Sequence, residues 1–324
     1  MFWSRIVGTG SFVPPKVLTN RDLERTVETT DEWIRTRTGI SERRVVVNET
    51  AADMGVLASK AALKAAGISP KDIDMVVVGT VTPDMTFPST ACLVQSLLGI
   101  KSGVPCFDVS AACSGFLYAV DVADKYIKTG VVKNALVIGV DLFSRLLDWK
   151  DRGTCVLFGD GAGAVVLTST RGRHAVLSTH IHSDGRYWEM LYAPSAISPS
   201  PFEKRDQQRP YLKMQGNETF KLAVRTLRSA CSEIIEKNGL RPEDIALLIP
   251  HQANMRIINA AKEMLKLADH QVYTNIERYG NTSAGSIPLA LDEALRSNRI
   301  KTDDILIFIA FGGGFTWAGA AVRW

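Results

Sequence analysis

One cysteine, one histidine and one asparagine could together perform covalent chemistry in this sequence. Cys113 lies in a turn of small residues, between an apolar run at 106–109 and a helical pattern from Ser114 to about Thr129. Backbone N–H groups and the macrodipole at a helix N-terminus favour an anion, so we expect a Cys113 thiolate below the ordinary thiol pKa of about 8.5. Cysteine is also a common small buried residue, so spacing alone leaves a structural role open.

A nucleophilic cysteine needs partner groups that handle charge, and the chain offers five histidines. His251 directly follows an apolar run at 245–250 and precedes a helical pattern, and sites gather at strand ends in α/β sheets. Asn281 lies in a second turn of small residues that opens a helix, where its alternative role is an N-cap. His180 and His182 alternate along a predicted strand without a well-spaced third ligand, so no metal site is predicted.

An internal repeat relates the elements that would carry these residues. The segment GISPKDI at 67–73 matches GLRPEDI at 239–245, an offset of 239 − 67 = 172 residues. Each segment follows a helical pattern and precedes an apolar strand. The predicted helices cover 51–66 and about 218–238, and the predicted strands cover 74–79 and 245–250. The repeat therefore indicates two related halves.

Two further pairs keep nearly this offset. The Cys113 turn and its helix pair with the Asn281 turn and its helix, so twofold pseudosymmetry would bring the two helix starts face to face. Strands at 136–140 and 159–166 pair with strands at 305–309 and 312–322. Such alternation favours mostly parallel sheets covered by helices. We expect an α/β unit at 1–172 with the cysteine and a second at 173–324 with the histidine and asparagine.

Composition excludes several other classes of protein. The 324 residues include 38 basic and 34 acidic side chains, which leave a net charge of +4. This overall charge gives no reason to predict a nucleic-acid-binding protein. Five scattered cysteines indicate reduced thiols in the cytoplasm, and neither a signal sequence nor a membrane-length apolar segment is present. Glycines at 8–10 and 159–161 lack the spacing of a phosphate loop. The segment 185–210, with Pro194, Pro199 and Pro201, is predicted to be a long surface excursion.

Beyond these patterns, the sequence resembles β-ketoacyl-acyl carrier protein synthase III, the initiating condensing enzyme of bacterial fatty acid synthesis within the thiolase superfamily. The likeness covers essentially the whole chain, and its motifs together are highly specific. They are DEWIRTRTGI at 31–40, FPS at 87–89, AACSGF at 111–116, DRGT at 151–154, FGDGAG at 158–163, MQGN at 214–217, HQAN at 251–254, GNTS at 280–283 and FGGGFTW at 311–317.

The resemblance implies a thiolase-like fold, in which two α/β halves related by pseudo-twofold symmetry form an α-β-α-β-α core. It also implies a catalytic triad of Cys113, His251 and Asn281, whereas the elongating relatives carry a second histidine where this chain has Asn281. We expect the backbone N–H groups of Cys113 and Gly313 to form the oxyanion hole. The implied substrates are acyl-CoA and malonyl-acyl carrier protein, the implied assembly is a homodimer, and no metal or redox cofactor is expected.

The residues that bind substrates in the family match this sequence more closely at some sites than at others. For CoA, the matching residues are Trp33, Arg37, Arg152, Gly216, Phe220 and Asn254, whose indole, guanidinium and amide groups suit adenine, phosphate and pantetheine. Trp33 could instead be a core aromatic residue. By resemblance, Phe87 reaches across the dimer to close the acyl pocket. Carrier-protein docking falls on Lys221, Arg256 and Lys262, where the match is looser because Glu263 interrupts the family's lysine pair.

Two alternatives to a condensing enzyme remain from the residues alone. A thiolase-fold acyltransferase of secondary metabolism would use Cys113 to move acyl groups to an alcohol or amine without condensation. A non-catalytic acyl-CoA sensor would keep the pocket but would not need the cysteine, histidine and asparagine together. Carbon–carbon bond formation that depends on malonyl thioester distinguishes the condensing enzyme from both.

Overall fold

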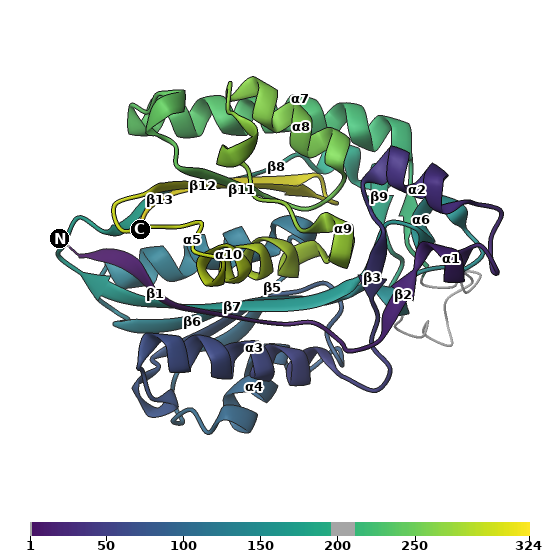
Figure 1. Ribbon diagram of the computed structural model, residues 1–324. Helices are drawn as coiled ribbons and strands as arrows, with labels where there is room; N and C mark the ends of the chain where they lie inside the picture. Colours follow the sequence, from purple (N-terminus) through teal and green to yellow (C-terminus); the bar gives the residue numbers. More distant parts are fainter. Residues whose placement is uncertain (1, 196–210) are drawn as a thin grey trace.

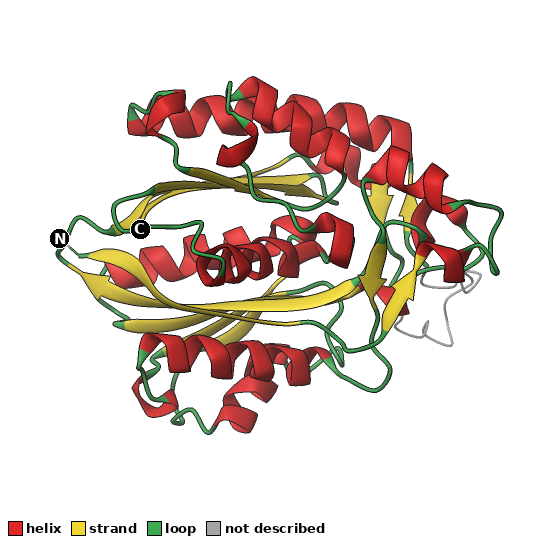
Figure 2. Cartoon of the chain, in the orientation of Figure 1, coloured by secondary structure: helices red, strands yellow, loops and turns green. Residues whose placement is uncertain are grey.

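Layers of helices and sheets alternate in the order α-β-α-β-α (Figures 1 and 2) in the computed structural model, which describes residues 2–195 and 211–324. One outer layer holds α3 (Ala51–Ala66) and α4 (Thr90–Leu98), the central layer holds α5 (Gly115–Lys128) and α10 (Ser286–Arg296), and the other outer layer holds α7 (Gly216–Asn238) and α8 (Met255–Met264). This is the layered core expected of a thiolase-like fold.

Two mixed sheets separate the helical layers. The first has the order β1-β7-β6-β4-β5, and the second has the order β11-β12-β13-β8. The strands of the first are β1 (Trp3–Phe12), β4 (Met75–Gly79), β5 (Cys106–Val109), β6 (Asn134–Leu142) and β7 (Asp160–Thr170). The strands of the second are β8 (Ala175–Ser183), β11 (Leu247–Pro250), β12 (Ile305–Gly312) and β13 (Thr316–Arg323).

The prediction of mostly parallel sheets was wrong. In the described chain, parallel pairing joins β4 to β5, β4 to β6 and β11 to β12, whereas the other four pairings in these sheets are antiparallel. The reason is that each half ends in two neighbouring strands without a covering helix between them. Strands β12 and β13 are joined by the short turn 313–315, which permits only antiparallel pairing.

Local sequence signals explain the repeated helices. Thr50 and Asp53 form a capping box at the start of α3, and Gly67 ends the helix with φ +64°. Gly239 ends α7 in the same left-handed conformation, with φ +60°. After each glycine comes a single 3-10 turn, at Pro70–Asp72 and Pro242–Asp244, before the buried strand β4 or β11. The predicted helices at 51–66 and about 218–238 are confirmed.

The two sheets have corresponding strand orders. Reading inwards from the antiparallel edge, β1, β7, β6 and β4 correspond to β8, β13, β12 and β11. Strand β5 has no full counterpart, and a single parallel bridge between Leu248 and Val272 stands beside β11 in its place. The residue pair 172–173 lies in the connection between β7 and β8. One sheet therefore comes from the chain before this connection and the other from the chain after it.

Apolar side chains fill the space between the layers. The central cluster surrounds α5 and α10 between the sheets and includes Phe116, Ile287 and Phe308. Two further clusters lie beneath the outer helices, one under α3 and α4 and the other under α7 and α8. The two helices whose starts carry Cys113 and Asn281 are thus held between two sheets.

Short elements gather at one end of the layers, on the right in Figure 1. They are β2 (Val17–Thr19), α1 (Asn20–Leu23), α2 (Asp31–Thr38), β3 (Glu42–Arg44), α6 (Arg152–Cys155), β9 (Leu191–Tyr192), β10 (Lys213–Met214) and α9 (Ile276–Tyr279). Part of the predicted excursion at 185–210 is regular, because 3-10 turns cover Gly185–Met190 and β9 pairs with β10. Residues 196–210 of this segment, with Pro199 and Pro201, lie outside the described residues. Among the described helices, none is both long and apolar enough to cross a membrane.

Candidate active site

Cys113 lies in a 3-10 turn, Ala112–Ser114, between the end of β5 and the start of α5. Ala112 has φ +47°, which turns the chain sharply, and the cysteine is only 5% exposed. Burial raises the pKa of the Cys113 thiol to about 12; a hydrogen bond from Ser283 lowers this pKa, and the Asp141 carboxylate raises it. This direction is opposite to the lowered thiol pKa that we expected from the helix N-terminus, and its largest cause is desolvation of the buried sulfur.

His251 follows directly after β11 and is 2% exposed. Its Nδ1 lies 2.7 Å from Ser286 Oγ, on the first residue of α10, and Ser286 Oγ also accepts a 3.4 Å hydrogen bond from the Gln252 backbone N–H. The Ser286 hydroxyl proton is then available to Nδ1, so we assign the ring proton to Nε2. Burial lowers the pKa of His251 to about 3, and the ring is therefore neutral at pH 7.

The Nε2 atom of His251 is buried and has no hydrogen-bond partner within the described parts of the chain. A buried polar atom without a partner is unfavourable, and such atoms occur where a ligand completes the hydrogen bond. The Phe311 ring contacts the imidazole edge-on, with the ring centroids 5.6 Å apart. His251 is thus held in place through Nδ1 and presents Nε2 as a free donor.

Asn281 lies just before the 3-10 turn Ser283–Gly285 that opens α10, and it is 6% exposed. Its Oδ1 accepts a 2.8 Å hydrogen bond from the backbone N–H of Ser283, which is the structural role open to an asparagine before a helix. Because Oδ1 is engaged by the backbone, the amide NH2 is the group that Asn281 can offer to a ligand. Asn281 therefore stabilises its turn and can also donate a hydrogen bond.

A cavity of about 510 Å³ brings Cys113, His251 and Asn281 together. The halves of the chain meet here, because Cys113 comes from the first half and the other two residues come from the second. The other predicted residues that line the cavity are Arg37, Gly216, Phe220, Lys221, Asn254 and Arg256. A nucleophile, two hydrogen-bond donors and several cations thus share one cavity.

Trp33 forms a stack with two other predicted CoA contacts, Arg37 and Arg152. The Arg37 guanidinium lies 4.8 Å from the centroid of the indole, and the Arg152 guanidinium lies 5.0 Å from it. Trp33 also packs against the small cluster that includes Ile34, so it has both a core contact and a cation-binding face. The indole already binds cations on its ring, and a planar ligand would have to share or replace these contacts.

Several of the predicted contacts to substrate or carrier protein already have partners in the protein. Asn254 caps α8, with Oδ1 accepting from the Arg256 backbone and Nδ2 donating one hydrogen bond to the Arg37 carbonyl. The Arg256 guanidinium lies 4.8 Å from the centroid of the Phe220 ring at the cavity wall. Lys221 is exposed and pairs with Glu218 on the same helix.

Besides Trp33 and Arg152, three further predicted residues do not line the cavity. Gly313 lies just beyond it, in the turn whose neighbour Gly312 approaches the Cys113 backbone nitrogen so closely that an added Cβ would lie 2.6 Å from it. Phe87 is 82% exposed, on the loop after β4. Lys262 instead forms a 2.6 Å ion pair with Asp269 beyond the end of α8.

The sequence did not identify the residues that hold the catalytic side chains and their turns in position. Ser286 and Phe311 hold the His251 ring, and Asp141 accepts a hydrogen bond from the backbone of Ala284. Phe311 and Ser283 stand inside recognised motifs, so the motifs marked them without assigning a role. Asp141 had one signal, because it is a carboxylate at the end of an otherwise apolar strand.

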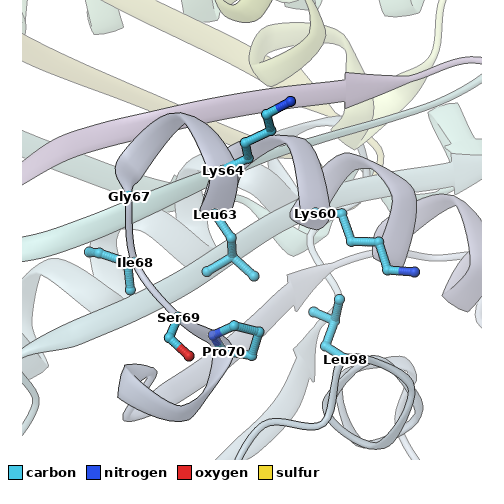
Figure 3. Close-up of a pocket in the computed structure, with 8 residues that line it drawn as sticks. All are labelled: Lys60, Leu63, Lys64, Gly67, Ile68, Ser69, Pro70 and Leu98. Atoms are coloured by element: carbon cyan, nitrogen blue, oxygen red, sulfur yellow. The ribbon is translucent and has the colours of Figure 1, made fainter.

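A second cavity, of about 440 Å³, lies at the ends of α3 and α4 (Figure 3). Leu63 and Leu98 line it, as do Lys60 and Lys64 of α3. The Ser69 hydroxyl accepts a hydrogen bond from the backbone of the turn that follows it. This cavity contains no cysteine or histidine, so it lacks the groups that distinguish the Cys113 cavity.

The chain matches models of one known protein family in both of its halves. Family models for 3-oxoacyl-[acyl-carrier-protein] synthase III match residues 107–185 and, for the C-terminal part, 235–324. The chain is 54% identical to a β-ketoacyl-[acyl-carrier-protein] synthase III of Alkalilimnicola ehrlichii, with 100% of both chains covered.

Solved structures agree over the whole chain. The crystal structure of 3-oxoacyl-[acyl-carrier-protein] synthase III from Aquifex aeolicus has a TM-score of 0.93 at 48% identity and covers 99% of this chain and 100% of its own. The β-ketoacyl-[acyl-carrier-protein] synthase III of Thermus thermophilus has a TM-score of 0.93 at 42% identity, with 99% of each chain covered. The chain therefore belongs to the β-ketoacyl-[acyl-carrier-protein] synthase III family of condensing enzymes.

Proposed function

We propose that this enzyme initiates fatty acid synthesis by transferring an acyl group from acyl-CoA to Cys113 and joining it to malonyl-acyl carrier protein. The observation that carries the proposal is the buried His251 Nε2, which has no partner among the described residues and shares a cavity with Cys113 and Asn281. A thiol, an amide and a neutral imidazole donor suit two successive thioester reactions. Neither reaction requires a metal or a redox cofactor.

In the first reaction, Cys113 Sγ attacks the thioester carbonyl of acyl-CoA. A carbon–sulfur bond forms to Cys113, the bond to the CoA sulfur breaks, and the thiol proton ends on the departing CoA. Backbone N–H groups of Cys113 and Gly313 would hold the developing oxyanion. The close packing of Gly312 on the Cys113 nitrogen supports this role, since it keeps the glycine turn beside the attacked carbon.

In the second reaction, malonyl thioester loses carbon dioxide. The electron pair of the broken carbon–carbon bond forms an enolate, whose oxygen accepts hydrogen bonds from His251 Nε2 and the Asn281 amide. A neutral imidazole can donate in this way at physiological pH, which agrees with the lowered pKa of His251. The enolate carbon attacks the acyl carbonyl, the bond from that carbon to Cys113 Sγ breaks to release the β-ketoacyl product, and the sulfur takes up a proton from water.

Substrate binding would use the cationic rim of the cavity. Arg37 and Arg152 can bind the phosphates of CoA beside Trp33, and Gly216 and Phe220 line the path of the pantetheine. Lys221 and Arg256 are placed to receive an acidic carrier protein because both line the cavity. Lys262 is a weaker candidate, since its charge is paired with Asp269.

The proposal includes a homodimer and a cytoplasmic location. Phe87 is a large apolar side chain with 82% exposure, which favours a partner over solvent, and a second copy would bring it to the acyl pocket. All five cysteines are unpaired, as suits a reducing compartment. A secondary-metabolic acyltransferase is less favoured, because the similar curated proteins carry the name of the condensing enzyme.

Intact-mass spectrometry tests the covalent step. Wild type and Cys113→Ser are incubated separately with acetyl-CoA, isobutyryl-CoA and longer acyl-CoAs. We expect one acyl adduct on the wild type and none on the variant, and the adduct identifies the primer. Addition of malonyl-carrier protein should then remove the adduct and yield a β-ketoacyl carrier protein. If the wild type acquires no adduct from any primer, covalent catalysis is excluded.

Carrier docking can be tested in the second half of that experiment. Arg256→Glu should require a higher carrier-protein concentration for half-maximal loss of the adduct, because it reverses a charge at the cavity mouth. Lys64→Glu is the matched control, because this lysine lies on α3 in the opposite outer layer. Equal effects of the two reversals would remove Arg256 from the docking site.

A further inference from the structure

The Ser283 hydroxyl contacts the nucleophilic sulfur but has no role in the reaction steps proposed above. Its hydroxyl lies 3.4 Å from Cys113 Sγ, and both residues are buried. The serine comes from the start of α10 and the cysteine from the turn before α5, so the contact joins the two halves of the chain. Within the described residues, Ser283 is the side chain that donates a hydrogen bond to the Cys113 sulfur.

The backbone fixes the direction of this hydroxyl. Ser283 has φ +51°, a conformation that few residues other than glycine adopt, and its N–H donates to Asn281 Oδ1 at 2.8 Å. The next residue, Ala284, donates its N–H to Asp141 Oδ2 at 3.1 Å. The turn is therefore tied on both sides, and Ser283 cannot move away from the sulfur without breaking a buried bond.

The Ser283 hydroxyl has one proton and two possible acceptors, the Cys113 sulfur and the Asp141 carboxylate. The carboxylate does not depend on this proton, because two hydroxyls and two backbone N–H groups already donate to it. These donors are the Thr80 and Thr82 hydroxyls at 3.1 and 3.0 Å, the Val81 N–H at 2.8 Å and the Ala284 N–H at 3.1 Å. The serine proton is thus available to the sulfur when the sulfur becomes an anion.

We propose that Ser283 is a further catalytic residue, whose hydroxyl donates a hydrogen bond to Cys113 Sγ and favours its thiolate form. The inference rests on the proposed function for its role in acylation. A hydrogen bond to a charged group is stronger than one to a neutral group, so the bond strengthens as the thiolate forms. This donor partly offsets the burial and the Asp141 charge, both of which raise the pKa of the thiol.

Alkylation by iodoacetamide measures the thiolate without any acyl substrate. The rate of modification of the Cys113 peptide is followed by mass spectrometry between pH 7 and 10 in the full-length enzyme. Ser283→Ala should lower the rate at pH 8 about tenfold, because one hydrogen bond to an anion is lost. An unchanged rate and pH profile would overturn the proposal.

Two further variants make the result decisive. Ser114→Ala removes a buried hydroxyl next to Cys113 that has no hydrogen-bond partner among the described residues, so its alkylation rate should match the wild type. Ser283→Gly also removes the hydroxyl and suits a positive φ, so it replaces the alanine variant if that variant does not fold. It should show the same tenfold loss.

The two hypotheses can fail independently. Acyl adducts on the wild type together with unchanged alkylation of Ser283→Ala would leave the condensing function intact and reject the serine. Slower alkylation of Ser283→Ala, with no adduct on the wild type from any primer, would keep the serine and reject acyl transfer.

Discussion

The turn before α5 and the turn before α10 have the same backbone and different chemistry. Each is a 3-10 turn whose first residue has a positive φ, +47° at Ala112 and +51° at Ser283. At the next position, one turn carries Cys113 and the other carries Ala284. The nucleophile therefore belongs to one turn only, and the other turn contributes a hydroxyl and an amide.

This comparison separates what the repeated fold supplies from what single side chains supply. The fold supplies two sharp turns that face each other between two sheets, and each leads into a central helix. The alanine in the first turn also shows that the conformation needs neither glycine nor a hydroxyl. The Ser283 hydroxyl and the Asn281 NH2 group are therefore not needed to form the second turn, and they can serve as hydrogen-bond donors in the condensation.

Removing the amide from the second turn tests this division of labour most strongly. Asn281→Ala should lower carbon dioxide release from malonyl-carrier protein by a hundredfold or more, on the order seen when an oxyanion donor is lost. Acylation of Cys113 should fall much less, since the sulfur stays in the first turn and the variant breaks only one of the two bonds that hold the Ser283 turn. Both steps are followed together, by trapped carbon dioxide and by intact mass.

Asn281→Asp is the matched variant for this test. It keeps an oxygen acceptor for the Ser283 N–H but replaces the NH2 donor. It should lose decarboxylation like the alanine variant. Full decarboxylation activity in Asn281→Asp, or equal loss of both steps in Asn281→Ala, would contradict the assigned roles.

The burial of His251 between these turns predicts a pH dependence of stability. Its folded pKa, about 3, lies below the ordinary value of 6.5, so between these values the unfolded chain binds a proton that the folded protein does not. The contribution of His251 to stability is then complete above pH 6.5 and is lost as the pH falls. The loss at pH 5 should be about 2 kcal/mol.

Urea unfolding at pH 8 and pH 5 checks this prediction. His251→Gln has no titrating ring, so its free energy of unfolding should fall about 2 kcal/mol less than that of the wild type over this interval. If the two proteins lose equal stability between pH 8 and pH 5, the buried imidazole is protonated in the folded state.

A smaller effect should come from Ser286, the first residue of α10 and the one that follows the second turn. Ser286→Ala removes the 2.7 Å partner of His251 Nδ1 and frees the ring to rotate or change tautomer. Carbon dioxide release should fall about tenfold, in line with the loss of one buried hydrogen bond. Alkylation of Cys113 by iodoacetamide should be unchanged, and a parallel loss there would mean that the variant disturbs both turns.

Much of the frame was predictable from local signals. The capping box at Thr50, the glycines that end α3 and α7, and the repeated segment before β4 and β11 are short-range patterns. The mixed pairing of the sheets was missed, because β-branched apolar strands have the same composition in parallel and antiparallel neighbours. The supporting residues Ser286 and Asp141 were missed because their partners are distant in sequence.

The sequence by itself determined the helices, the buried strands and the three side chains around the cavity, since periodicity, capping and motifs act over short distances. The tertiary structure alone decided the protonation states. Burial between the sheets raises the pKa of Cys113 and lowers that of His251, against what the helix start suggested for the cysteine. Desolvation depends on everything packed around a group, and that packing is set by residues from both halves of the chain.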